Sequence, residues 1–160
     1  MDPADIVYNI ADGILAGELD GFRIRTYAGS GGRAGSKVPG AVNRLLANNP
    51  FATGVHGAGH LKGPLPMGRY KMKRHEVRSH WIRLDPERGN VMHGRAGFAI
   101  HGRGQVGSHG CIVPNDFSVV VRLYDLLAAR EKRGEPWPTL EVVAIGADLE
   151  SKFQLGRNLA

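Results

Sequence analysis

Short segments rich in apolar residues, several of them alternating apolar with polar positions, recur along the chain and predict β-strands. Residues that break regular structure lie between these segments. Gly63–Gly68, for example, places two prolines before one predicted strand, and Asp85–Gly89 is a predicted turn after another. The predicted strands are Phe22–Tyr27, Arg69–Met72, His80–Leu84, Phe98–His101 and Thr139–Ile145. We therefore expect a mostly β (α+β), sheet-based domain.

Helical periodicity is clear in one segment, residues 115–132. Its apolar residues are spaced three and four apart, as on one face of a helix, and Asn115-Asp116 offers a cap at its start. Gly134 and Pro136 end the pattern. The apolar face consists of Phe117, Val120, Val121, Tyr124, Leu127 and Ala128.

A weaker helical pattern occurs near the N-terminus, where Ile6, Ile10 and Ile14 repeat at a spacing of four. Residues 1–21 are therefore predicted to be a weakly helical N-terminal extension. The main domain is predicted to cover residues 22–145, because no linker divides that range. Residues 146–160 carry no strong pattern and are expected to form a C-terminal tail.

Composition and charge narrow the class of protein. The chain has 160 residues, of which 42% are hydrophobic and 22% are charged, as in an ordinary soluble domain. No apolar run approaches the roughly 20 residues of a membrane span, and no secretory signal is visible. The net charge of +6 favours an anionic partner, but the basic residues are scattered and form no recognisable nucleic-acid-binding motif. We expect no membrane insertion and no nucleic-acid partner, and a substrate that carries carboxylates fits the charge equally well.

The only cysteine, Cys111, ends a glycine-rich stretch that begins at Gly97. One cysteine permits no internal disulfide, so the thiol is free. A free thiol has a pKa of about 8.5 and becomes a useful nucleophile when an imidazole or a helix N-terminus favours its thiolate. The chain offers both, with His101 at the end of a predicted strand and a helix predicted after the cysteine. Gly110 permits a tight turn, so amides of residues 109–111 could bind an oxyanion. The stretch predicts a cysteine nucleophile with a histidine base.

Other interpretations of these residues stay open. A lone cysteine is most often a small buried residue, and His101 could be a strand histidine that hydrogen-bonds a carbonyl. His109 fits an exposed loop as well as a supporting catalytic role. His101, His109 and Cys111 could also ligate zinc. His56 and His60 form a further histidine pair. Zinc ligation would indicate a zinc-dependent amidase or peptidase, and the positive charge alone would suit a non-enzymatic binding module.

Two parts of the chain resemble a known family. Ser108–Ile112, together with Ile100–Gly102 upstream, resembles the signature of the YkuD-type L,D-transpeptidases. Gly63–Tyr70 is similar to that family's Pro-x-Gly-x-aromatic segment. These enzymes are cysteine acyltransferases of bacterial peptidoglycan. With this target, the alternatives are a zinc-dependent peptidoglycan amidase or peptidase and a non-enzymatic module that binds the cell wall. The resemblance implies an L,D-transpeptidase-like β-sandwich or barrel domain with one helix following the catalytic cysteine.

The chain departs from the larger family in two features. Its loop between histidine and cysteine is shorter, and Val113-Pro114 stands where asparagine or arginine is common. Both features match a narrower group, the L,D-transpeptidase-type effectors of type VI secretion systems. The segments that resemble this group's pattern are Tyr27–Gly29, Asn49–Pro50, 63–70, 98–102 and 108–112. The resemblance covers roughly residues 22–145.

The resemblance implies a reaction. Cys111 would attack the carbonyl between meso-diaminopimelate and D-Ala of a peptidoglycan stem tetrapeptide. His101 would take the thiol proton and later protonate the leaving amine, while the carbonyl of Gly102 orients its ring. Water would then complete an L,D-carboxypeptidase reaction, and an amine would complete exchange or cross-linking. The other implied catalytic residues are Ser108, His109 and Gly110.

The resemblance also implies how the substrate is bound and where the protein acts. Arg103 is a candidate to bind the terminal carboxylate of the substrate, and Tyr70 is a candidate to line the groove. No cofactor and no metal are expected. The expected partners are peptidoglycan stem peptides, a cognate immunity protein and a carrier of the secretion apparatus. The protein would be made in the cytoplasm without a signal peptide, secreted, and act as a toxin in the periplasm of a target bacterium.

Overall fold

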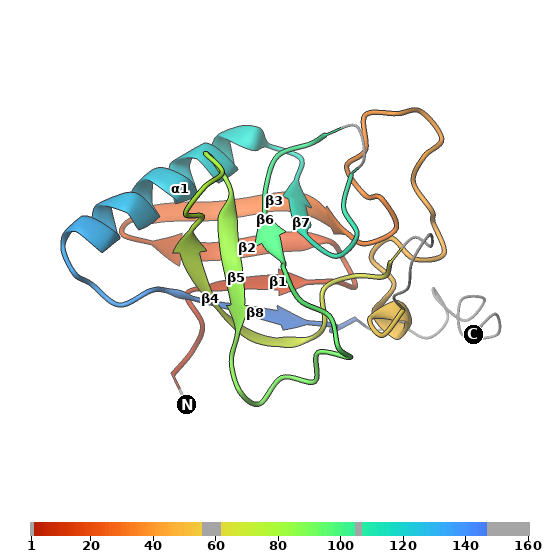
Figure 1. The fold of residues 1–160 in the computed structure, drawn as a ribbon, viewed down its shortest axis with the longest axis horizontal. Coiled ribbons are helices and arrows are strands. Elements are labelled where there is room, and N and C mark those ends of the chain that lie inside the picture. The colour runs from red at the N-terminus through yellow and green to blue at the C-terminus, as the bar shows by residue number, and fades with distance from the viewer. Residues whose placement is uncertain (1, 56–61, 105–106, 147–160) are drawn as a thin grey trace.

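The alternating segments form strands, and three segments without a predicted strand join them (Figure 1). The computed structural model describes residues 2–55, 62–104 and 107–146. Its strands are β1 (Ile6–Asn9), β2 (Ile14–Leu19), β3 (Phe22–Ser30), β4 (Gly68–Arg74), β5 (Ile82–Pro86), β6 (Ala99–Ile100), β7 (Ile112–Pro114) and β8 (Thr139–Val143). Its helices are η1 (Pro50–Ala52), a single 3₁₀ turn, and α1 (Phe117–Lys132). The expected mostly β architecture with one helix after the cysteine is confirmed.

The eight strands form a closed barrel in the order β1-β2-β3-β7-β6-β5-β4-β8. Neighbouring strands are antiparallel except for two parallel pairs, β1 with β8 and β6 with β7. Closure gives each of these eight strands a partner on both sides, so none of the described strands is an edge strand. The inward-facing side chains form one apolar core, in which the largest fully buried residues include Tyr8, Tyr70 and Met72.

The N-terminal segment is not the weakly helical extension that its isoleucine spacing suggests, because it forms β1 and β2. Residues four apart lie on one face of a strand and nearly on one face of a helix, so that spacing fits both. The residue between them distinguishes the two, since Tyr8 is as fully buried as Ile6 and Ile10, a period of two. Gly13 turns the chain with a φ of +72°. Because β1 pairs with β8 and β2 with β3, this segment closes the barrel and belongs to the main domain.

Several predicted strand boundaries shift in the structure. β5 begins two residues later than predicted and includes Asp85 and Pro86, which the sequence places in a turn. β6 keeps only the two central residues of its predicted segment, and β8 ends at Val143. Cross-strand pairing decides these ends, as in the pairing of Pro86 with Tyr70 across β4 and β5.

Helix α1 begins two residues later than predicted, after Asp116, whose side chain accepts a hydrogen bond from the amide of Ser118 at 3.0 Å. It packs against β4, β5 and β7. The face that it buries is rotated from the predicted one, because Phe117 is 49% exposed. The buried residues are Val119, Val120, Leu123 and Leu127. Among the described residues no helix is long and apolar enough to cross a membrane.

Candidate active site

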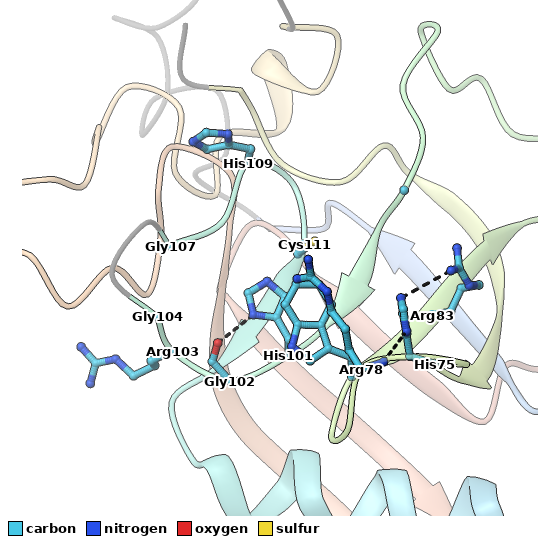
Figure 2. A pocket seen from close by; sticks show the side chains of 12 residues that line it. His75, Arg78, Arg83, His101, Gly102, Arg103, Gly104, Gly107, His109 and Cys111 are labelled. Carbon is cyan, nitrogen blue, oxygen red and sulfur yellow. Dashed lines mark hydrogen bonds between the residues drawn. The ribbon is translucent and has the colours of Figure 1, made fainter. Parts of the chain in front are cut away.

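His101 directly follows β6 and Cys111 directly precedes β7, and these two short strands are parallel. Ile100 of β6 pairs with Ile112 of β7, and both are fully buried in the core. The amide of His101 donates to the carbonyl of Ile112 at 3.1 Å. Because successive residues of a strand face opposite sides, His101 and Cys111 leave on the face opposite these isoleucines. They line the same cavity, which has a volume of about 720 Å³ (Figure 2).

The imidazole of His101 is oriented from two directions. Its Nδ1 lies 2.7 Å from the carbonyl oxygen of Gly102. A carbonyl only accepts, so Nδ1 carries the hydrogen and Nε2 is the basic nitrogen of the neutral ring. The indole of Trp81 stacks on the ring with centroids 4.2 Å apart and planes 11° apart. The expected contact with Gly102 is confirmed, whereas the role of Trp81 was not predicted from the sequence.

Burial controls the protonation of both groups. It raises the pKa of the Cys111 thiol, which a backbone hydrogen bond with Ala99 and nearby arginine charges lower by less. Burial also lowers the pKa of the His101 imidazole, against the opposing hydrogen bond to Gly102, and the charge of Arg78 adds to the lowering. Both shifts favour the neutral forms. At neutral pH the resting site therefore holds a thiol beside a neutral imidazole, an arrangement suited to general-base catalysis.

The alkylation rate of Cys111 should rise with pH and inflect above the pKa of about 8.5 of a free cysteine. A raised thiol pKa leaves less thiolate at neutral pH, so alkylation is slow there and accelerates as the thiol ionises. Iodoacetamide labelling of folded and denatured protein from about pH 6 to about pH 10 tests this. Each labelled molecule carries one adduct, because Cys111 is the only cysteine. Fast labelling of the folded protein that is already constant below about pH 7 would contradict the prediction, because it would indicate a preformed thiolate.

The turn before Cys111 is held by Ser108. Its buried hydroxyl donates to the carbonyl of Cys111 and accepts from the amide of Gly110 at 3.1 Å. Gly110 has a φ of +133°, and a Cβ there would lie 2.4 Å from a ring carbon of Phe98, so the turn requires glycine. Because Ser108 uses the Gly110 amide, the amides of His109 and Cys111 are the remaining candidates to bind an oxyanion. Ser108 thus positions the cysteine through the backbone.

Ser30, at the end of β3, ties the cysteine turn to two other parts of the barrel. Its hydroxyl donates to the carbonyl of Gly110 at 2.8 Å and accepts from the amide of Leu65 at 2.9 Å. The side chain is fully buried. One hydroxyl therefore joins β3, the proline-containing turn Gly63–Gly68 and the cysteine turn. The role of Ser30 was not predicted from the sequence, because its partners are distant along the chain.

Arg95 is a buried arginine, only 7% exposed, whose guanidinium donates to backbone carbonyls. In the part of the chain that the structure describes, no carboxylate forms an ion pair with it. It therefore leaves a positive charge close to Cys111 and joins the cysteine turn to two other loops. The carbonyls are those of Thr53, Pro64 (2.7 Å), Gly63 (2.8 Å) and His109 (3.0 Å).

His109 lines both the cavity with His101 and a smaller cavity of about 270 Å³. The smaller cavity is also lined by Lys62 and Cys111, so the thiol lies between two openings. Burial lowers the pKa of the His109 imidazole, and the charges of Lys62 and Arg33 add to the lowering. Its Nε2 is buried without a hydrogen-bond partner among the described residues. A neutral ring that lines the same cavities as Cys111 is compatible with the supporting role that the sequence suggests.

Of the two residues predicted to bind the substrate, only one lines the cavity. Tyr70 does not line the cavity, because it is fully buried in the core and its hydroxyl donates to the carbonyl of Pro66 at 2.6 Å. Its assignment to the groove is wrong. Arg103 does line the larger cavity, but its side chain extends away from Cys111 and His101 (Figure 2).

The expectation that a helix dipole activates Cys111 is also wrong. Strand β7 separates the cysteine from α1, which begins at Phe117. The N-terminus of that helix is capped by Asp116, and the dipole acts only within about one turn of a helix end. Arg78 and Arg95 are the positive groups that act on the thiol instead.

The described ranges 2–55, 62–104 and 107–146 contain no group of three His, Cys, Asp or Glu side chains that could hold a zinc ion. His56 and His60 lie outside the described residues.

The sequence and the fold were also compared with models of protein families, with curated proteins and with solved structures. None of the three comparisons found a match.

Proposed function

We propose that this protein is a cysteine acyltransferase that cleaves the bond between meso-diaminopimelate and D-Ala in peptidoglycan stem tetrapeptides. One observation carries the proposal: Cys111 and an oriented, neutral His101 share one cavity. The substrate class is supported by the resemblance of Ser108–Ile112 and Gly63–Tyr70 to the L,D-transpeptidases.

In the proposed reaction, Nε2 of His101 takes the proton of the Cys111 thiol as the sulfur attacks the scissile carbonyl. Backbone amides of the cysteine turn stabilise the oxyanion that forms. His101 then gives its proton to the leaving amine of D-Ala, and a thioester to diaminopimelate remains on the sulfur. Water resolves this acyl-enzyme in an L,D-carboxypeptidase reaction, and an amine resolves it in exchange or cross-linking.

The charge of the larger cavity agrees with an acidic peptide substrate. The charged side chains known to line it are the arginines Arg78, Arg83 and Arg103, and no aspartate or glutamate of the described residues lines it. Stem peptides carry several free carboxylates, so a cavity with this lining attracts them.

The resemblance to type VI secretion effectors supports a proposal about where the protein acts and what it does to the target cell. The protein would be an antibacterial toxin that acts in the periplasm of a target bacterium, where it shortens or caps the donor stems that the target needs for its own cross-links. Such a toxin requires a cognate immunity protein in the producing cell and a carrier in the secretion apparatus.

Purified disaccharide tetrapeptides incubated with the wild-type protein should lose one alanine residue, measured by mass spectrometry. Added D-amino acid should appear in place of the lost D-Ala if an amine competes with water. The Cys111→Ala variant, which removes the sulfur and retains a small side chain, should leave the tetrapeptide unchanged.

Cleavage by Cys111→Ala at the wild-type rate would exclude the thiol mechanism, and its loss on chelation would then favour the zinc enzyme. Tetrapeptides that remain intact with wild-type protein would contradict the proposed substrate. Salt-sensitive binding to cell-wall sacculi without any cleavage would instead indicate the non-enzymatic module.

A further inference from the structure

Two side chains of the loop between β4 and β5, Arg78 and Trp81, form a stack with His101, which follows β6, at the wall of the larger cavity (Figure 2). The guanidinium carbon of Arg78 lies 4.4 Å from the ring centroid of Trp81. The Trp81 ring in turn stacks on the imidazole of His101, with ring centroids 4.2 Å apart. The guanidinium therefore belongs to the same stacked group as the imidazole of the candidate base.

The loop that carries Arg78 is held by hydrogen bonds. Nδ1 of His75 accepts from the amides of Val77 and Arg78 at 3.1 and 2.9 Å, and the His75 ring meets Trp81 edge-on at 6.0 Å. Arg83 forms an ion pair with Glu76 at the base of the same loop. These contacts fix the backbone at Arg78, and the residue itself is exposed.

Arg78 is the arginine of the cavity that is best placed to bind an anion near the reacting atoms. Arg83 is already paired with Glu76, and Arg103 points away from Cys111 and His101 (Figure 2). In the described part of the chain, no carboxylate lies within ion-pair distance of Arg78. Its donors are therefore available to a ligand in the cavity.

We propose that Arg78, and not Arg103, binds a carboxylate of the acyl donor, so that the site selects donors in which the residue that supplies the scissile carbonyl has a free side-chain carboxylate. A guanidinium held over an aromatic ring still has N–H groups that can form two parallel hydrogen bonds to a carboxylate. This inference rests on the proposed function for the identity of the donor. In that donor the carboxylate is the one at the far end of the diaminopimelate side chain, which a lysine-containing stem lacks and which amidation neutralises.

The first test uses alkylating reagents and needs no peptidoglycan. Cys111 is labelled with iodoacetate, which carries a carboxylate, and with neutral iodoacetamide, and the ratio of the two rates is compared among variants at low salt. Arg78→Gln should lower the ratio of iodoacetate to iodoacetamide rates roughly threefold or more, because it removes a positive charge that faces the reagent. Arg103→Gln is the matched control, and it should change the ratio by less than about 1.5-fold.

The second test compares stem peptides whose diaminopimelate is a free acid or a side-chain amide. The wild-type protein should cleave the free acid with a kcat/KM about tenfold higher, as expected for a charge-assisted pair. Arg78→Gln should lose this preference, Arg78→Lys should keep part of it, and Arg103→Gln should keep all of it.

The outcomes separate this inference from the proposed function. If wild-type protein cleaves the stems but Arg78→Gln changes neither the reagent ratio nor the preference for the free acid, the inference is overturned and the proposed function stands. If no stem is cleaved but Arg78→Gln alone lowers the reagent ratio, the carboxylate site stands and the proposed substrate is wrong. An equal effect of Arg103→Gln on the ratio would also overturn the assignment to Arg78.

Discussion

Replacement of His101 by glutamine is expected to lower kcat/KM for the release of D-Ala at least about a hundredfold, because general-base and general-acid catalysis typically contribute this much or more. Glutamine can still hydrogen-bond a carbonyl but can neither take a proton from Cys111 nor return one to the leaving amine. Cys111→Ala is expected to abolish release altogether, since no nucleophile remains. Product formation by mass spectrometry and the urea-unfolding midpoint of each variant provide the measurements.

A matched control for His101→Gln is available on the surface. His93 is exposed and does not line either cavity, and its φ of +55° is one that asparagine tolerates. His93→Asn should retain activity within about twofold. Activity of His101→Gln close to that of this control, with both variants folded, would mean that His101 is not the base.

Arg95→Met is expected to cost about 3 kcal/mol of unfolding free energy and most of the activity. Methionine occupies similar space but leaves four backbone carbonyls, three of them in buried hydrogen bonds, without the donors that Arg95 supplies. Because one of these carbonyls belongs to His109, the cysteine turn should lose its position at the same time. Urea unfolding and iodoacetamide labelling of Cys111 measure the two effects separately.

Two further variants separate the hydrogen bonds of Arg95 from its charge. Arg95→Lys keeps a positive charge near Cys111 but lacks the planar fork, so it should recover part of the thiol reactivity while remaining less stable than wild type. Arg88→Met, at an exposed position in the turn after β5, should stay within about 0.5 kcal/mol of wild type. If Arg95→Met were as stable as Arg88→Met, the network of carbonyls would not hold the turn.

Cys111 could be predicted as a candidate nucleophile from its neighbours alone. A buried structural cysteine rarely has a glycine-rich, polar surround, and the stretch from Gly97 to Cys111 has both features together with His101. The structure brings both side chains to one cavity, as the sequence predicts, because the strands that flank the loop pair in parallel. The orienting carbonyl of Gly102 is adjacent in the chain and was predicted for that reason.

The supporting residues could not be recognised in this way. Trp81 acts by stacking on a histidine from another strand, and Arg95 acts through the carbonyls of distant loops. Nothing in the local sequence of either residue differs from that of an ordinary strand tryptophan or a loop arginine. Tyr70 shows the opposite error, because alternation in β4 predicts two faces but does not say which one the barrel encloses.

The sequence by itself determined the mostly β class, the long helix and the thiol–histidine pair, because each depends on periodicity or on neighbours within a few residues. The tertiary structure decided the state of the N-terminal segment, whose spacing of four fits a helix and a strand alike. Pairing of β1 with β8 resolves that ambiguity, since it satisfies the backbone of both strands and closes the barrel. The tertiary structure also decided the electrostatics of the thiol. Strand β7 separates Cys111 from the helix, and folding instead brings Arg78 and Arg95 close to Cys111.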